Sequence, residues 1–230
     1  MNFDFGIVVM HWPVFLNGLI TTFFLSVITI FLGTVLGILL ALAKRSKTKY
    51  FSTPASAWID FFRIMPILVL LVWFFYALPL ITGFGLDAFW IASIVLTLAG
   101  SAFIAETFKS GFDAIPQGEI EAAYCLGLNR IQVFFQIILP QAFLIVLAPL
   151  IGNYIEQIKN TTLATIIAAN ELLHLSQILI SQTYRPLEIY TTLGILFFVL
   201  LFPLTYFSKK IEQKFSKYRQ STDLAEGIHV

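Results

Sequence analysis

Long uncharged stretches separated by short polar ones dominate the hydrophobic pattern of this chain. A helix needs about 20 mostly apolar residues to cross the hydrocarbon core of a bilayer. Helices are expected in these stretches because lipid offers no partner to an exposed backbone polar group. Runs without Asp, Glu, Lys or Arg predict five transmembrane helices, at about residues 19–43, 64–86, 88–105, 131–155 and 189–208.

The remaining uncharged segments are expected at the membrane surface. The first uncharged run starts well before residue 19, but Pro13, Asn17 and Gly18 favour an interfacial start. Residues 161–170 and 172–184 are too short to span, and a re-entrant or interfacial helix is expected to begin near Asn160. No internal repeat or linker is evident, so residues 1–230 are predicted to form one all-α integral membrane domain.

Composition and charge agree with this fold class. The chain has 230 residues, of which 58% are hydrophobic and only 12% are charged, whereas soluble domains average about 25% charged residues. A formal net charge of +1 gives no reason to expect nucleic-acid binding. Three scattered histidines and a single cysteine predict neither a metal site nor an internal disulfide.

Basic residues predict the orientation of the spans, because Lys and Arg concentrate on the cytoplasmic side of membrane proteins. With the amino terminus outside, only Lys159 and Arg185 of the 14 basic residues fall on the external side. We therefore expect an external amino terminus and a cytoplasmic carboxyl terminus, with a cytoplasmic tail at residues 209–230.

A polar segment at residues 109–136, between the third and fourth predicted spans, is expected to contain a short helix. Pro116 fits the start of this helix, where a missing N–H costs little, and Glu119 and Glu121 suit its first turn, where the helix dipole favours negative charge. Gly127 suits the position after the helix end, where φ is positive. Asn129 and Gln132 are typical of a capping box for the next helix.

The same segment carries an apolar stripe at helical spacing. Its members are Ile120, Tyr124, Leu128 and Ile131. One interpretation is an amphipathic helix lying on the lipid surface, and the other is a helix that docks on a partner. Beyond the stripe, Pro140 is expected to tilt or restart the helix that enters the membrane.

The motif in this segment resembles the EAA loop of ABC importer permeases. The resemblance rests on Glu121-Ala122-Ala123, on Gly127 and on Leu139-Pro140. It implies that a helix at about residues 119–126 couples the permease to an ATP-hydrolysing subunit. The coupling residues that it implies are Glu121, Ala122, Ala123, Gly127, Leu139 and Pro140.

Other segments resemble the polar amino-acid uptake permeases, which serve histidine, glutamine, arginine, cystine and opines. These segments are residues 18–26, 63–68, 100–106, 152–153, 159–163 and 171–172. The chain departs from the family pattern at Ile64-Met65, where the family has Gly-Thr, and at Asn160, where it has Asp. Because one carboxylate is lost, the resemblance implies amino acids as a class and leaves their charge open.

Several partners follow from this resemblance. It implies a type I ABC importer transmembrane domain in the bacterial cytoplasmic (inner) membrane, paired with a second permease subunit, identical or related. It also implies two ABC ATPase subunits, which bind ATP and Mg, and an extracytoplasmic substrate-binding protein. The sequence has no Gly-x-x-x-x-Gly-Lys-Ser/Thr motif, so we expect no enzymatic activity and no cofactor in this chain itself.

Polar residues near the spans are candidates for the substrate path, because such residues are costly in lipid. The candidates are Arg63, Glu106, Asn153, Glu156, Lys159, Asn160, Thr161 and Thr162. Structural roles remain open for several of them. Arg63 also fits a cytoplasmic anchor paired with Asp60, and Glu106 fits a loop-anchoring carboxylate. Glu156 and Lys159 also fit a simple pair on one helix face.

Two other functions remain to be weighed. An ion-coupled secondary carrier of small polar solutes would need paired ionisable residues at mid-membrane and usually an inverted repeat. An intramembrane enzyme would need a nucleophile or a metal cluster within the spans. Neither pattern is evident in the sequence.

Overall fold

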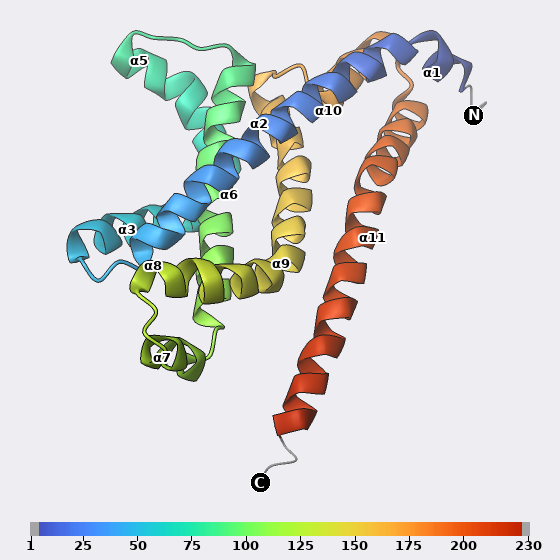
Figure 1. Cartoon of the computed structure of the whole chain (residues 1–230). Helices are drawn as coiled ribbons and strands as arrows, with labels where there is room; N and C mark the ends of the chain where they lie inside the picture. The colour runs from blue at the N-terminus through green and yellow to red at the C-terminus, as the bar shows by residue number, and fades with distance from the viewer. Residues whose placement is uncertain (1–4, 227–230) are drawn as a thin grey trace.

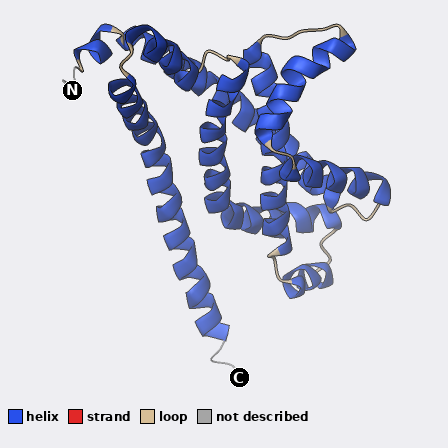
Figure 2. Ribbon diagram, turned by 180° about the vertical axis from the view of Figure 1, so that it is seen from behind, coloured by secondary structure: helices blue, strands red, loops and turns tan. Residues whose placement is uncertain are grey.

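The structure is a computed structural model that describes residues 5–226, with side chains to residue 213. Every element in this part of the chain is helical (Figures 1 and 2). The α-helices are α1 Gly6–Met10, α2 Trp12–Lys44, α3 Lys49–Ile64, α4 Ile67–Val72, α5 Leu78–Thr82, α6 Ala88–Asp113, α7 Gln117–Cys125, α8 Arg130–Val133, α9 Leu139–Asn160, α10 Leu172–Thr183 and α11 Pro186–Glu226. Two π-helical turns, Trp73–Ala77 and Phe134–Ile138, and a 3₁₀-helix, Thr161–Ile167, connect some of them.

Within residues 5–226, four helical segments are long and apolar enough to cross a membrane: α2, α6, the α8–α9 segment and the first part of α11. A fifth span results if the bent pair of α3 with α4–α5 counts as one. The helices extend beyond the predicted spans. α2 begins at Trp12, α6 continues to Asp113, and α11 runs beyond Ser208. Each predicted span was limited to residues without charge. A helix can continue past a charged residue, because a long charged side chain reaches polar surroundings from within the helix.

The second predicted span was wrong at its start. Residues 65 and 66 separate α3 from α4, and the two helical directions differ by 100°. Met65 is extended, with ψ of 131°, because the ring of the following Pro66 disfavours the helical conformation before it. Arg63 therefore lies in the last turn of α3 instead of starting a span.

Small residues allow α2 and α6 to pack closely and form the centre of the fold (Figure 1). A Cβ atom at Gly37 would lie 2.7 Å from Cγ2 of Ile104 and 3.0 Å from the carbonyl of Ser101. A Cβ atom at Gly100 would lie 2.6 Å from Oε1 of Gln157, on α9. α6 is thus held between α2 and α9.

α7 lies beyond the end of α6, on short connections to α6 and α8 (Figure 1). The predicted helix is confirmed with slightly different bounds, Gln117–Cys125. The capping box of Asn129 and Gln132 is also confirmed. A π-helical turn comes just before Pro140, whose missing N–H interrupts the α-helical hydrogen bonding.

α10 lies at the opposite end of α6 from α7 (Figure 1). The helix expected from Asn160 is a 3₁₀-helix, Thr161–Ile167, which ends at Ala168 with φ of 56°. α10 follows from Leu172 and packs against α2 and α11. Of the tail predicted at residues 209–230, α11 includes residues as far as Glu226, and residues 227–230 lie outside the described part.

Candidate functional site

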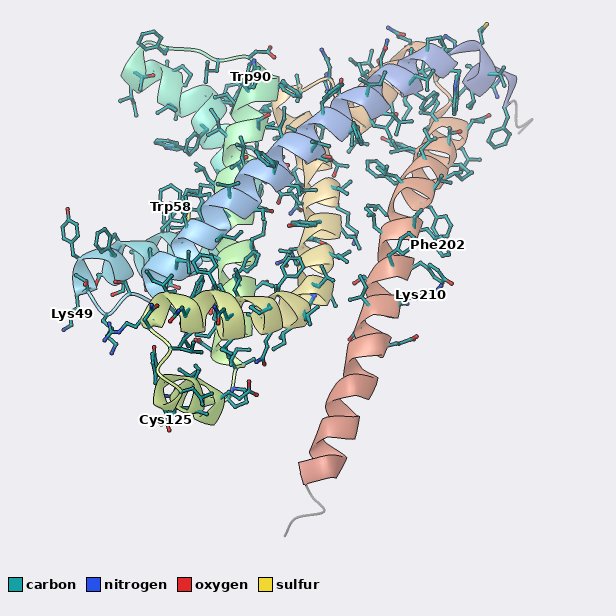
Figure 3. All side chains as sticks on the ribbon, viewed as in Figure 1. Lys49, Trp58, Trp90, Cys125, Phe202 and Lys210 are labelled. Carbon is teal, nitrogen blue, oxygen red and sulfur yellow. The ribbon has the colours of Figure 1, made fainter. Side chains whose placement is uncertain are left out.

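The surface of α7 is almost entirely open. Ala123 is its buried residue, at 4% exposure, whereas Leu126 is 83% exposed and Tyr124 is 45% exposed. The predicted apolar stripe is divided: Tyr124 and Ile131 are exposed, whereas Ile120 and Leu128 are half-buried against the neighbouring hydrophobic cluster. Cys125 lies near the outer tip of the helix (Figure 3).

The end of α7 is a Schellman motif centred on Gly127. The N–H of Leu128 donates to the carbonyl of Ala123 at 3.2 Å, and the N–H of Gly127 donates to the carbonyl of Tyr124 at 3.0 Å. Gly127 has φ of 82°, which confirms the positive φ predicted for it and which a residue with a Cβ adopts only at a cost.

Apolar packing and a side-chain hydrogen bond hold α7 to the rest of the chain. Ala123 packs into a cluster that includes Phe112 of α6 and Ala142 of α9. Nε2 of Gln141 donates to Oε2 of Glu119 at 2.6 Å. These contacts connect α7 to both α6 and α9.

A hollow of about 460 Å³ beside α7 is lined by Lys47, Tyr124 and Arg130.

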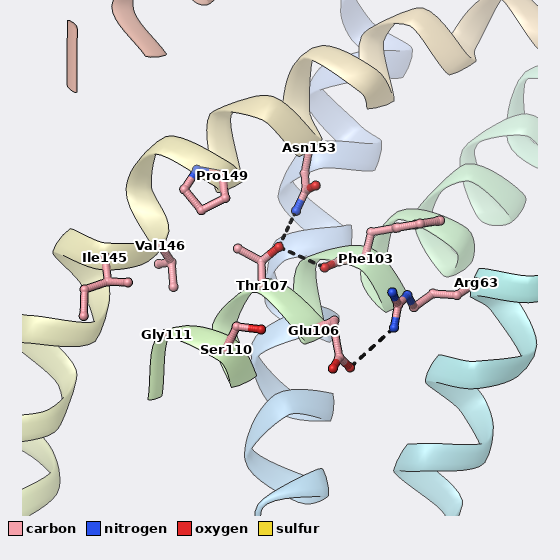
Figure 4. Close-up of a pocket in the computed structure, with 10 residues that line it drawn as sticks. All are labelled: Arg63, Phe103, Glu106, Thr107, Ser110, Gly111, Ile145, Val146, Pro149 and Asn153. Atoms are coloured by element: carbon pink, nitrogen blue, oxygen red, sulfur yellow. Dashed lines mark hydrogen bonds and ion pairs between the residues drawn. The ribbon is translucent and has the colours of Figure 1, made fainter. Parts of the chain in front are cut away.

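A cavity of about 350 Å³ lies between the end of α3, α6 and α9 (Figure 4). Its lining residues are Arg63, Phe103, Glu106, Thr107, Ser110, Gly111, Ile145, Val146, Pro149 and Asn153. Three of the predicted path residues, Arg63, Glu106 and Asn153, therefore come together here.

Ion pairs converge on Glu106 at one side of this cavity. Oε2 of Glu106 lies 2.9 Å from Nζ of Lys44 and 3.8 Å from Nη1 of Arg63. The guanidinium of Arg63 also lies over the ring of Phe103. The interpretation that paired Arg63 with Asp60 was wrong, because the side chain of Arg63 extends from α3 toward α6. The ends of α2 and α3 are thus held to α6.

Amide side chains of α9 connect it to α6. Nδ2 of Asn153 donates to Oγ1 of Thr107 at 2.7 Å. One turn further, Nε2 of Gln157 donates to the carbonyl of Leu96 at 2.7 Å. Gln157 is 4% exposed, and sequence reasoning missed it. Its spacing of four residues from Asn153 was the available signal, since both lie on one face of a helix.

The other predicted path residues, near the end of α9, do not converge on one point. Glu156 and Lys159 form a pair at 3.6 Å, and each is more than half exposed. Thr161 is buried and donates its hydroxyl to the carbonyl of Ile158, and Thr162 donates to that of Lys159. Asn160 is half-buried beside them.

Beyond this segment lies a buried carboxylate, Glu171, which is fully covered and caps α10. Its two oxygens accept the N–H groups of Leu173 and His174, each at 2.7 Å. Burial raises the pKa of Glu171 to about 7, although both backbone hydrogen bonds act in the opposite direction.

Comparisons with known proteins agree on one family. Residues 33–217 match the family described as binding-protein-dependent transport system inner membrane component. The chain is 31% identical to the arginine transport system permease protein ArtQ of Bacillus subtilis, over 93% of this chain and 98% of that protein. It is 33% identical to the octopine transport system permease protein OccM of Rhizobium meliloti, over 94% of each.

Solved structures extend the agreement to three dimensions. The fold resembles that of a crystallised amino acid ABC transporter with histidines, with a TM-score of 0.86, 29% identity and coverage of 93% of this chain and 100% of that one. A subunit of the MetNI methionine ABC transporter matches with a TM-score of 0.72 and coverage of 89% and 97%. At 22% identity, this second likeness concerns the fold alone.

Proposed function

The chain belongs to the family of binding-protein-dependent transport system inner membrane components, and from that premise we propose that it is a permease subunit of an ATP-driven importer of polar amino acids. Its fold is that of a type I ABC importer permease. Relatives named for the transport of arginine and octopine support amino acids as the substrate class. The proposed location is the bacterial inner membrane.

In this proposal the chain has five spans, with its amino terminus outside and its carboxyl terminus in the cytoplasm. The segment α4–α5, residues 67–82, is the short fifth span, and α7 lies on the cytoplasmic side. The basic residues that follow α2 and lie near the end of α11 support this orientation.

The observation that carries the coupling role is the exposed surface of α7. A helix with a single buried residue gains little stability from packing, yet its end is specified by a Schellman motif at Gly127. An uncovered apolar surface on a well-defined helix fits a docking site for another protein. We assign that partner as an ABC ATPase subunit, with Glu121, Ala122 and Ala123 on the docking helix.

Motion of α7 would reach the membrane through the contacts described above. α6 leads into α7, and the bond between Glu119 and Gln141 connects α7 to the start of α9, next to Leu139 and Pro140. Both α6 and α9 line the cavity that contains Arg63 and Asn153. A displacement of α7 on ATP binding would therefore change the walls of this cavity.

The assembly in this proposal has two permease subunits, identical or related, two ATPase subunits that bind ATP and Mg, and an extracytoplasmic binding protein. This chain carries no catalytic residues and supplies part of the path. Arg63, Glu106 and Asn153 line its inner cavity, and Glu156, Lys159, Asn160, Thr161 and Thr162 lie nearer its outer end. Both charge signs occur along it, as a zwitterionic amino acid requires.

Replacing Gly127 tests the coupling role. In proteoliposomes that contain the whole complex, Gly127→Val is expected to reduce ATP-driven amino-acid uptake strongly while ATP hydrolysis continues. The physical reason is the positive φ at Gly127, which costs a residue with a Cβ about 1–2 kcal/mol.

Gly118→Val is the matched control, because Gly118 lies within α7 without a positive φ, and a Cβ there would meet nothing within 4 Å, as at Gly127. Unchanged uptake by Gly127→Val would contradict the coupling role. Uptake that follows an ion gradient without any ATPase subunit would instead identify a secondary carrier.

A further inference from the structure

α3 is an amphipathic helix with three distinct faces. Spacings of three and four residues place side chains of one kind along the same side of a helix. The buried stripe is Ala55, Ile59 and Phe62. The exposed apolar stripe is Tyr50, Pro54, Ala57, Phe61 and Ile64, and the polar stripe is Lys49, Thr53, Ser56, Asp60 and Arg63.

The buried stripe packs against α2 and α6. The exposed apolar stripe lies on another side of α3, so these two helices do not cover it. Tyr50 is 80% exposed, Ile64 is 79% exposed and Phe61 is 50% exposed. A row of this kind along a whole helix would be unfavourable in water. Some apolar surrounding must therefore cover it.

The direction of α3 argues against a spanning helix. α3 lies across the direction of α6, at the end where α2 finishes, and so does the start of the α8–α9 segment (Figure 1). α4–α5 turns away from α3 by 100°. If α6 crosses the bilayer, α3 therefore lies along its surface.

Charge completes the pattern. Four basic residues, Lys44, Arg45, Lys47 and Lys49, occur just before α3 or at its start. Lys44 and Arg45 face the carboxylates of Glu106 and Asp113. Lys47 and Lys49 are exposed, and neither forms an ion pair with a described side chain. Lys49 lies at the outer end of α3 (Figure 3).

We propose that α3 is an interfacial helix that binds anionic phospholipids. Its exposed apolar stripe lies among the upper acyl chains, and Lys47 and Lys49 bind the phosphate groups. A helix with apolar residues on one side and basic residues beside them has this affinity for an anionic membrane surface. The proposal rests on insertion of the chain in a bilayer and not on the coupling role of α7.

This lipid contact would also fix one wall of the cavity. Arg63 is the last basic residue of α3, and its guanidinium pairs with Glu106 at the cavity. A helix held at the membrane surface keeps Arg63 in place while α6 and α9 move.

Depth-dependent quenching tests the position of α3. In the Cys125→Ala background, Phe61→Cys and Asp60→Cys each receive the same fluorescent label, and the whole complex is reconstituted with lipids that carry a quencher on their acyl chains. Both positions are exposed and adjacent in sequence, but they lie on different stripes. The label at position 61 is expected to be quenched several times more strongly.

Equal quenching at the two positions would overturn the proposal. So would cross-linking of position 61 to its equivalent in a second permease subunit together with weak quenching, because the apolar stripe would then be a protein interface.

Lipid retention tests the charges. The complex with Lys47→Gln and Lys49→Gln is purified from vesicles of equal phosphatidylglycerol and phosphatidylcholine, and the retained lipids are measured by mass spectrometry. The preference for phosphatidylglycerol is expected to fall by roughly tenfold, since each basic residue near an anionic surface contributes appreciably. The matched control is Lys209→Gln with Lys210→Gln on α11. An unchanged preference in the first variant, or an equal fall in both, would overturn the proposal.

Discussion

α6 and α11 have the same mean hydropathy of 2.0 over their most apolar windows, but their surroundings differ. Within the single chain, 67% of the α6 window is buried and only 17% of the α11 window is buried. α6 lies between α2, α3 and α9, whereas α11 exposes Phe198 and Phe202 and lies at one side of the molecule (Figures 1 and 3).

The difference lies in side-chain size and not in hydropathy. α6 buries many small residues, among them Ala92, Ser93, Ala99, Gly100, Ser101, Ala102, Ala105 and Gly111. α11 presents a row of large aromatic and branched side chains instead. Because lipid is as apolar as leucine, helices associate in membranes where small residues allow close approach. Hydropathy thus identifies a span, and residue size indicates whether that span packs against protein.

The largest difference in stability is expected between enlarging a glycine that packs against α6 and enlarging a glycine on α11. Gly37→Leu introduces atoms where a Cβ already lies 2.7 Å from Ile104, so the free energy of unfolding is expected to fall by about 3 kcal/mol. Gly194→Leu on α11 meets nothing within 4 Å. Its effect is expected to be neutral or stabilising by up to about 1 kcal/mol, because leucine favours a helix over glycine.

Thermal unfolding of both variants in the same lipid nanodiscs measures the difference. Equal losses of stability at the two positions would contradict the interpretation that residue size separates α6 from α11.

A smaller effect is expected from removing carboxylates. Glu106→Gln leaves the cations of Lys44 and Arg63 without their shared partner in a half-buried position, and we expect a loss of about 2 kcal/mol. Glu156→Gln breaks a pair in which both side chains are more than half exposed. That change is expected to cost about 0.5 kcal/mol or less. Unfolding of both variants in matched nanodiscs gives the comparison, and similar costs would show that Glu106 does not anchor α2 and α3.

The pairing of Glu106 illustrates what the sequence could and could not predict. Uncharged runs located the cores of the spans, and local spacing predicted α7, its positive-φ glycine and the next capping box. Lys44 and Glu106 are 62 residues apart, and no local pattern shows that their helices end side by side. α3 was missed because Lys49, Asp60 and Arg63 interrupt its apolar residues, although their spacing marks an amphipathic helix.

A third effect concerns pH and the buried carboxylate of Glu171. Its pKa is raised from 4.5 to about 7 by burial, so between these pH values the folded chain binds more protons than the unfolded chain. Stability is therefore expected to decrease as pH rises through this window. Glu171→Gln removes the titrating group and should flatten the profile.

Thermal midpoints of the wild type, Glu171→Gln and the exposed control Glu156→Gln, measured between pH 5 and pH 8, test this linkage. A profile that Glu171→Gln leaves as steep as that of the wild type would assign the pH dependence to other groups.

The smallest effect on stability is expected at α7, where exposure has a different meaning from exposure on α11. Leu126 is 83% exposed, so Leu126→Ala is expected to change the free energy of unfolding by less than about 0.5 kcal/mol. If the open surface of α7 binds an ATPase subunit, the same substitution removes apolar contact there and should weaken retention of that subunit by about tenfold.

Leu80→Ala is the matched control, because Leu80 is 88% exposed on α5. Co-purification of the ATPase subunit with each variant separates the two cases. A Leu126→Ala chain that retains the subunit as well as the wild type does would place the docking contact elsewhere. A loss confined to Leu126→Ala would mean that an uncovered apolar residue faces lipid on one helix and a protein partner on another.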